Sequence, residues 1–82
     1  MKTRENLSLK NPNMLFADGF DDALVGTTLR EGTRVALYST DKCIEILAKD
    51  MSYEDAEEFF YFNVEGSYVG LNTPKFSLNE NL

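Results

Sequence analysis

The sequence predicts an α+β fold in which a β-hairpin packs on two consecutive helices, and three observations lead to this prediction. Two short runs rich in β-branched residues, 23–29 and 34–39, are separated by a turn that contains Gly32. Two segments with helical spacing of apolar residues follow them. The stretch 69–77 can add a third strand, although Pro74 restricts it to an edge or to irregular structure.

A chain of 82 residues is expected to form a single small domain (residues 1–82), because it can bury only about 60% of its unfolded surface around one modest core. Residues 1–13 are polar, carry mixed charge and end in the turn signal Asn11-Pro12-Asn13. We expect them to form a lead-in arm that can be mobile. In the first strand, Gly26 indicates a bulge or a close approach of another backbone.

The first helix is expected over residues 41–49, with Ser39, Thr40 and Asp41 at its cap. Cys43 lies on its apolar stripe beside Ile44, so we interpret this thiol as a small core residue. Nucleophilic catalysis by the thiol is disfavoured because the chain contains no histidine that could serve as its base.

The second helix begins at Ser52, whose hydroxyl suits an N-cap, and ends before Gly66. Steps of about 100° per residue place four side chains on one stripe, Tyr53, Ala56, Phe60 and Val64. The same steps place three acidic side chains on the opposite side, Glu54, Asp55 and Glu58. The pattern therefore predicts an amphipathic helix of about three turns that supplies much of the core.

Three residues of this helix depart from the simple pattern. Phe62 falls near the acidic side and Phe59 at its border. Either a neighbouring loop or the C-terminal tail covers these rings, or they form an exposed aromatic contact among carboxylates that can anchor a partner. Asn63 falls on the apolar side, where we expect its amide to bond the backbone of an adjacent loop or strand.

Composition excludes several classes of function. A single cysteine cannot form an internal disulfide, and the absence of histidine removes the usual general base and zinc ligand. No apolar run approaches the roughly 20 residues that span a bilayer, and the first ten residues lack the apolar core of a signal peptide. We therefore expect no enzyme activity, no cofactor and no membrane association. An oxygen-ligand metal site formed by Asp18, Asp21 and Asp22 remains an alternative, although their spacing is not that of an EF-hand.

The formal net charge is −6 and the sequence pI is about 4.4. Acidic residues concentrate between residues 18 and 60, whereas residues 1–17 carry a small excess of basic ones. Such a surface repels nucleic acid and favours a protein partner with a basic surface. A solvated acidic face that only keeps the protein in solution is the simpler alternative.

Four blocks of the sequence resemble a family of short phage- and virus-encoded proteins. They are DGFDDALVG (18–26), VALYSTDKCIEIL (35–47), MSYEDAEEFFYFN (51–63) and GSYVGLNTPKF (66–76). The resemblance spans residues 18–76 and implies a viral origin and the host cytoplasm as the setting. It implies no activity and assigns no functional residue.

These observations together predict a small acidic viral protein that acts as a non-enzymatic binding module on a host or viral protein. We expect five residues to form the contact surface, Glu54, Asp55, Glu58, Phe59 and Phe62. Two alternatives stay open. One is a self-associating structural protein in which Phe62 and a strand edge pair two copies. The other is a metal-binding protein that uses the loop of Asp18, Asp21 and Asp22.

Overall fold

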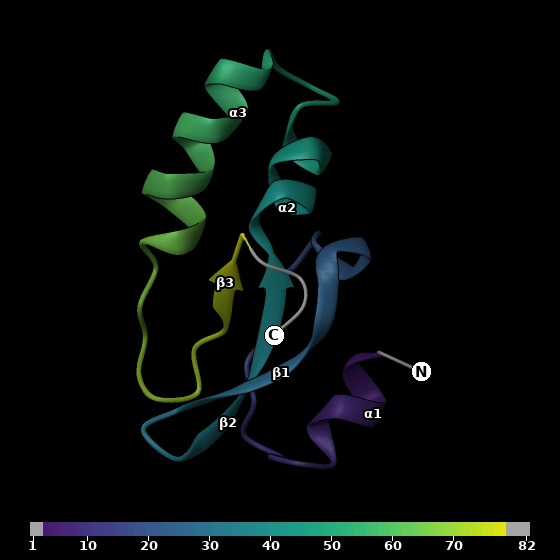
Figure 1. The fold of residues 1–82 in the computed structure, drawn as a ribbon, viewed down its shortest axis with the longest axis vertical. Coiled ribbons are helices and arrows are strands. Elements are labelled where there is room, and N and C mark those ends of the chain that lie inside the picture. The colour runs from purple at the N-terminus through teal and green to yellow at the C-terminus, as the bar shows by residue number, and fades with distance from the viewer. Residues whose placement is uncertain (1–2, 79–82) are drawn as a thin grey trace.

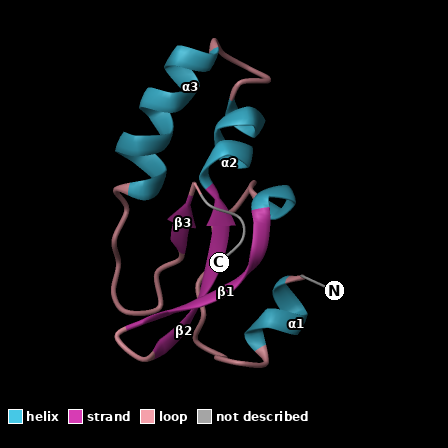
Figure 2. Cartoon of the chain, viewed as in Figure 1, coloured by secondary structure: helices cyan, strands magenta, loops and turns pink. Residues whose placement is uncertain are grey.

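The computed structural model describes residues 3–78. Its elements are α1 (Arg4–Ser8), the 3₁₀ turn η1 (Asp21–Ala23), β1 (Leu24–Arg30), β2 (Thr33–Ser39), α2 (Thr40–Leu47), α3 (Tyr53–Phe59), the π-helical segment η2 (Phe60–Glu65) and β3 (Lys75–Ser77). Figures 1 and 2 show α2 and α3 side by side at one end of a three-stranded sheet, with the β1–β2 turn at the other end. The predicted α+β fold, with its hairpin, third strand and two consecutive helices, is confirmed.

The hairpin closes through the two-residue turn Glu31-Gly32, in which both residues have positive φ, 48° and 83°. Such turns match the right-handed twist of the flanking strands. A register shift between Leu24 and Gly26 forms a bulge, and Gly26 occupies it with φ 154°. The predicted role of Gly26 is therefore confirmed, because a side chain would be strained there.

Strand β3 pairs with β2 in parallel, with Phe76 opposite Tyr38. Parallel neighbours cannot be joined by a tight turn, so the chain must cross over between them, and α2 and α3 form that crossover. The third strand is only three residues long and begins directly after Pro74. This position is consistent with the restriction that Pro74 imposes on strand pairing.

Both predicted helix caps are present. The Ser39 hydroxyl accepts a hydrogen bond from the Lys42 amide at 3.3 Å, and the Ser52 hydroxyl accepts one from the Asp55 amide at 3.1 Å. Helix α2 ends at Leu47, two residues before the expected end. Cys43 lies in the core, as its position on the apolar stripe predicts.

Helix α3 continues without a break into η2, so one helical rod runs from Tyr53 to Glu65. Ala56 and Phe60 are fully buried and Val64 is partly buried, as the stripe predicts. Tyr53, the fourth member, is 54% exposed, which corrects the prediction. The reason is its position in the first turn of α3, at the far end of the molecule (Figure 1).

The π-helical segment changes which way its residues face. Hydrogen bonds from i to i+5 widen the turn, so each residue advances by less than the roughly 100° of an α-helix. Asn63 consequently lies exposed, and its backbone carbonyl accepts a bond from the Ser67 hydroxyl at 2.8 Å. The predicted clamp by the Asn63 amide is therefore wrong. Gly66 ends the rod as expected, but with φ −73° rather than a left-handed conformation.

Within residues 1–13, where we expected a lead-in arm, the structure places the short helix α1. The Thr3 hydroxyl caps it by accepting a bond from the Asn6 amide at 3.3 Å. Leu7 is buried in the core, as is Met14 just after this segment. Part of the N-terminal segment therefore belongs to the packed domain.

Three aromatic rings join the helical rod to the sheet. Phe76 stacks on Tyr38 with ring centroids 5.5 Å apart, and Phe60 meets Phe76 edge to face at 5.2 Å. Tyr38 and Phe60 are fully buried. This cluster fixes the orientation of the rod and decides which of its sides faces outward. No helix within residues 3–78 has the length and apolar character required to cross a membrane.

Candidate functional site

All five residues predicted to contact a partner lie on the outward side of α3 and η2. Phe62 is 76% exposed and Phe59 is 43% exposed, and the three carboxylate residues are exposed as well. We call this surface the aromatic–acidic face. It consists of Glu54, Asp55, Glu58, Phe59 and Phe62. Among the described residues no loop covers the Phe62 ring, and the predicted cover by the C-terminal tail, residues 79–82, lies outside the described residues.

Two shallow, open hollows flank the Phe62 ring. One of about 370 Å³ is lined by Asp55, Glu58, Phe59, Phe62 and Asn63. The other, of about 340 Å³, is lined by Glu54, Glu57, Glu58, Tyr61 and Phe62. Glu58 and Phe62 border both hollows because residues four apart are neighbours on a helix surface. A protruding aromatic ring between two acidic recesses is the geometry that results.

The carboxylates of this face lack basic partners among the described residues. In the part of the chain that the structure describes, no lysine or arginine nitrogen lies within 4 Å of a carboxylate oxygen of Glu54, Asp55 or Glu58. Their charges therefore remain available to an approaching molecule. The pKa of Tyr61 is raised, first by its partial desolvation and then by the nearby charges of Glu65 and Glu57.

Tyr61 is a site residue that the sequence pattern did not identify. Its ring is 41% exposed, lines one of the two hollows and meets the Phe60 ring edge to face at 5.2 Å. A regular α-helix places it at the flank of the apolar stripe, where a tyrosine does not by itself indicate a binding role. The run of four aromatic residues from 59 to 62 was the available signal, because a helix cannot turn four successive side chains into one core.

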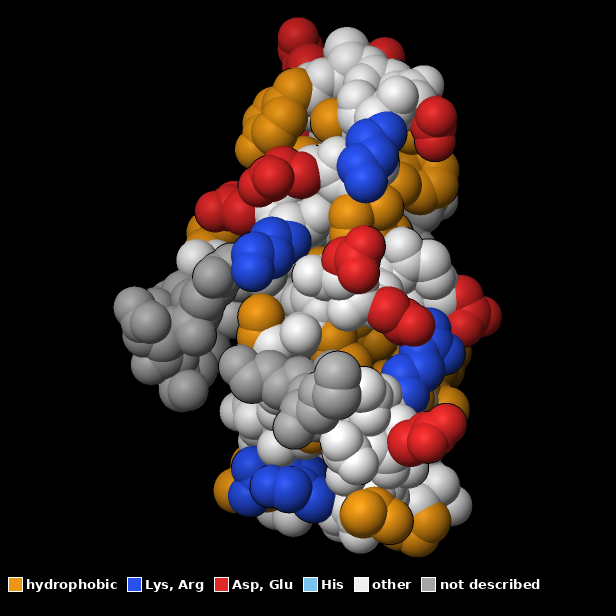
Figure 3. Space-filling model, turned by 90° about the vertical axis from the view of Figure 1, so that its right-hand side faces the viewer, with side chains coloured by type: hydrophobic (Ala, Val, Ile, Leu, Met, Phe, Trp, Pro, Cys, Tyr) orange, Lys and Arg blue, Asp and Glu red, His pale blue; other side chains and the backbone are white. Residues whose placement is uncertain are grey.

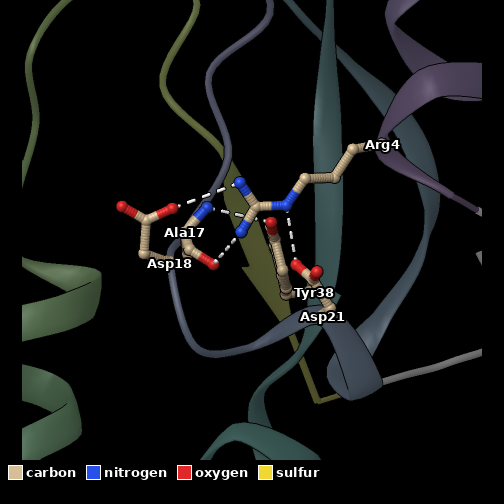
Figure 4. Close-up of polar contacts among 5 residues, drawn as sticks. All are labelled: Arg4, Ala17, Asp18, Asp21 and Tyr38. Atoms are coloured by element: carbon tan, nitrogen blue, oxygen red, sulfur yellow. Dashed lines mark hydrogen bonds and ion pairs between the residues drawn. The ribbon is translucent and has the colours of Figure 1, made fainter.

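The loop suggested as a metal site is organised by an arginine instead. The Arg4 guanidinium donates to the carboxylates of Asp21 at 2.7 Å and Asp18 at 3.2 Å, as Figure 4 shows. Asp22 lines a different hollow together with Lys42 and Lys49. Residues 3–78 contain no group of three side chains placed to hold a metal ion.

The same guanidinium also donates to the Ala17 carbonyl at 3.2 Å and lies 5.4 Å from the centroid of the Phe16 ring. The Ala17 amide in turn donates to the Tyr38 hydroxyl at 2.9 Å (Figure 4). The hydrogen bond with Asp21 is the largest cause that raises the pKa of Arg4. This network fastens α1 to the loop before β1, so its role is structural.

Cys43 is fully buried, and burial raises the pKa of its thiol to about 12. A thiol with such a pKa is almost entirely protonated at neutral pH, and the protonated form is a poor nucleophile. The geometry thus agrees with the interpretation of Cys43 as a core residue.

Comparisons of the chain with protein-family models, with curated proteins and with solved structures found no match.

Proposed function

We propose that this protein is a non-enzymatic binding module that captures another protein through the aromatic–acidic face. The observation that supports the proposal most is Phe62. Its ring is 76% exposed and lines one hollow together with the 43% exposed Phe59, so the two rings form an apolar patch rather than a single scattered residue. Aromatic anchors of this kind supply most of the binding energy at many interfaces.

The chemistry of the face defines the partner that fits it. Phe62, with Phe59 beside it, offers an anchor for an apolar pocket, and Glu54, Asp55 and Glu58 surround it with negative charge. The complementary surface is an apolar pocket rimmed by lysine or arginine. The rim charges would mainly accelerate and orient the encounter, whereas the aromatic ring would hold the complex.

The acidic balance of the chain opposes direct binding of nucleic acid and favours a basic protein partner. The sequence resemblance points to a viral protein, so we propose a host or viral protein as the partner and the host cytoplasm as the place of action. No residue set in this proposal performs chemistry, and no cofactor is required.

Capture of the partner from infected host cells tests the proposal. Immobilised wild-type protein is compared with Phe62→Ala and Glu58→Lys, and bound proteins are identified by mass spectrometry. Leu9→Ala is the matched apolar control, because Leu9 is exposed directly after α1. Glu45→Lys is the matched charge control, because Glu45 is exposed on α2.

We expect the wild type and both controls to retain a discrete, basic protein. Each face variant should retain at least about tenfold less of it. Retention of the same protein by the Phe62→Ala and Glu58→Lys variants at wild-type level would show that the aromatic–acidic face is not the binding site.

A further inference from the structure

The end of the molecule opposite α3 carries positive charge. The Arg30 guanidinium donates to the carbonyls of Thr73 and Pro74 and lies 5.4 Å from the centroid of the Tyr68 ring. The Lys75 ammonium donates to the Leu29 carbonyl at 3.4 Å. These contacts tie the end of β1 to the segment that leads into β3.

The cations at this end have no carboxylate partner among the described residues. Arg30 and Lys75 donate to neutral carbonyl oxygens and Arg34 donates to the Thr27 hydroxyl, and among residues 3–78 no carboxylate oxygen lies within 4 Å of these cations. This local set of cations contrasts with the net charge of −6 of the whole chain. Figure 3 shows lysine or arginine side chains at the lower end of the molecule, and others higher on the same face.

Exposed apolar side chains lie on the same segment as these contacts. Val69 is 72% exposed, Tyr68 is 59% exposed and Leu71 is exposed as well. The Val69 amide donates to the Thr73 hydroxyl at 3.0 Å, so the segment is folded onto its own backbone and holds these side chains in place. We call this surface the basic end. It consists of Arg30, Tyr68, Val69, Leu71 and Lys75.

We infer that the basic end of one copy of this chain docks on the aromatic–acidic face of a second copy. Each surface offers what the other lacks. The face presents carboxylates around a protruding ring, and the basic end presents cations beside exposed apolar side chains, and within residues 3–78 neither set forms an ion pair. The inference uses the same face as the proposed function and therefore rests on it.

The position of the two surfaces determines the kind of assembly. Figure 1 places α3 at one end of the long axis and the β1–β2 turn, with the segment before β3, at the other. A contact between two different surfaces of the molecule is heterologous, and it produces open head-to-tail chains unless the rotation closes a ring. A symmetric pairing through Phe62 alone would instead bring two sets of carboxylates together, which like charges oppose.

The net charge does not prevent this contact. Charges separated by more than about 8 Å are largely screened at physiological ionic strength, so the complementary groups at the contact outweigh the distant ones. Self-association and partner capture would then compete for the aromatic–acidic face. A partner that binds this face would therefore dissociate the head-to-tail chains.

Sedimentation equilibrium of the full chain with two complementary variants tests the inference. The face variant carries Glu58→Lys with Phe62→Ala, and the end variant carries Val69→Ser with Lys75→Glu. Far-ultraviolet circular dichroism and urea unfolding check that each variant is folded, and Leu71→Asp replaces the end variant if Lys75→Glu unfolds it. Glu45→Lys is the charge control.

We expect the mass of the wild type and the control to rise with protein concentration and to fall as salt is added. Each variant alone should associate at least about tenfold more weakly. The equimolar mixture of the two variants should form a dimer and stop there, because one intact face meets one intact end and the remaining surfaces are blocked.

A wild type that stays monomeric throughout, or an end variant that still forms dimers alone, would overturn the inference. The proposed function is judged separately. If the wild type is monomeric yet captures a partner through Phe62, only the head-to-tail contact fails. If the face variant captures that partner as well as the wild type does, the proposed function itself fails.

Discussion

Phe60 and Phe62 lie two residues apart on the same helical rod, yet one ring is fully buried and the other is 76% exposed. Phe60 packs edge to face on Phe76 and joins the rod to the sheet. Phe62 projects between two acidic hollows on the opposite side. The difference separates two roles within one run of aromatic residues, because burial contributes to stability whereas exposure leaves a ring available for recognition.

The largest expected effect concerns the buried ring. Replacement of Phe60 by alanine removes its contacts with Phe76 and leaves a cavity, so we expect a loss of about 3–5 kcal/mol in the free energy of unfolding. Urea unfolding followed by circular dichroism measures it. Phe60→Leu, which keeps most of the apolar volume, should lose clearly less. A loss below about 1 kcal/mol for Phe60→Ala would contradict the assignment of this ring to the core.

The thiol of Cys43 is fully buried on α2, as Phe60 is on the helical rod. Burial raises its pKa to about 12, so in the folded protein it should react with an alkylating reagent at pH 8 about a thousand times more slowly than in denaturant. Cys43 is the single cysteine of the chain, so the reaction reports on this position alone. Equal rates in the folded and unfolded chain would contradict the packing of α2.

Burial of the Cys43 thiol also makes the free energy of unfolding depend on pH. The pKa is higher in the folded than in the unfolded state, so the contribution of Cys43 to stability is complete below the ordinary pKa of about 9 and is lost as the pH rises toward about 12. The Cys43→Ala variant should show a smaller decline of the unfolding free energy over this range than the wild type.

A smaller effect is expected at the beginning of the rod. Ser52→Ala removes the hydroxyl that accepts from the Asp55 amide, which typically costs about 1 kcal/mol. The measurement is again the free energy of unfolding in urea. Ser52→Asp should recover most of the loss because aspartate caps as well as serine does, and failure of this rescue would show that the hydroxyl acts in another way.

Arg4 offers a still smaller, salt-dependent effect. Its ion pairs with Asp18 and Asp21 are largely open to solvent, so Arg4→Gln should cost less than about 1 kcal/mol. Added salt should narrow the difference between the variant and the wild type, since it screens the pair. A difference that does not respond to salt would assign the role of Arg4 to its packing on Phe16 instead.

The elements that the sequence predicted are those specified by local signals. Ser39 and Ser52 are N-cap residues that indicate where helices begin, and Gly26 and Gly32 indicate a bulge and a turn. Each of these residues affects only its near neighbours in the sequence. The parallel pairing of β3 with β2 depends on where α2 and α3 lead the chain. The contact of Arg4 with Asp18 and Asp21 joins residues far apart in the sequence, and neither feature leaves a local pattern.

The candidate site was predicted in part for the same reason. The outward position of Glu54, Asp55 and Glu58 follows from regular helix geometry in α3. The change to a π-helix at Phe60 turned Asn63 outward, and no local residue preference predicts that change.

The most direct test of the account is the free energy of unfolding of the Phe62→Ala variant in urea, measured at low protein concentration beside the wild type. An exposed ring that serves recognition contributes little to folding, so we expect the two values to agree within about 0.5 kcal/mol. A loss of about 2 kcal/mol or more would show that Phe62 belongs to the core and would remove the anchor on which the proposed recognition depends.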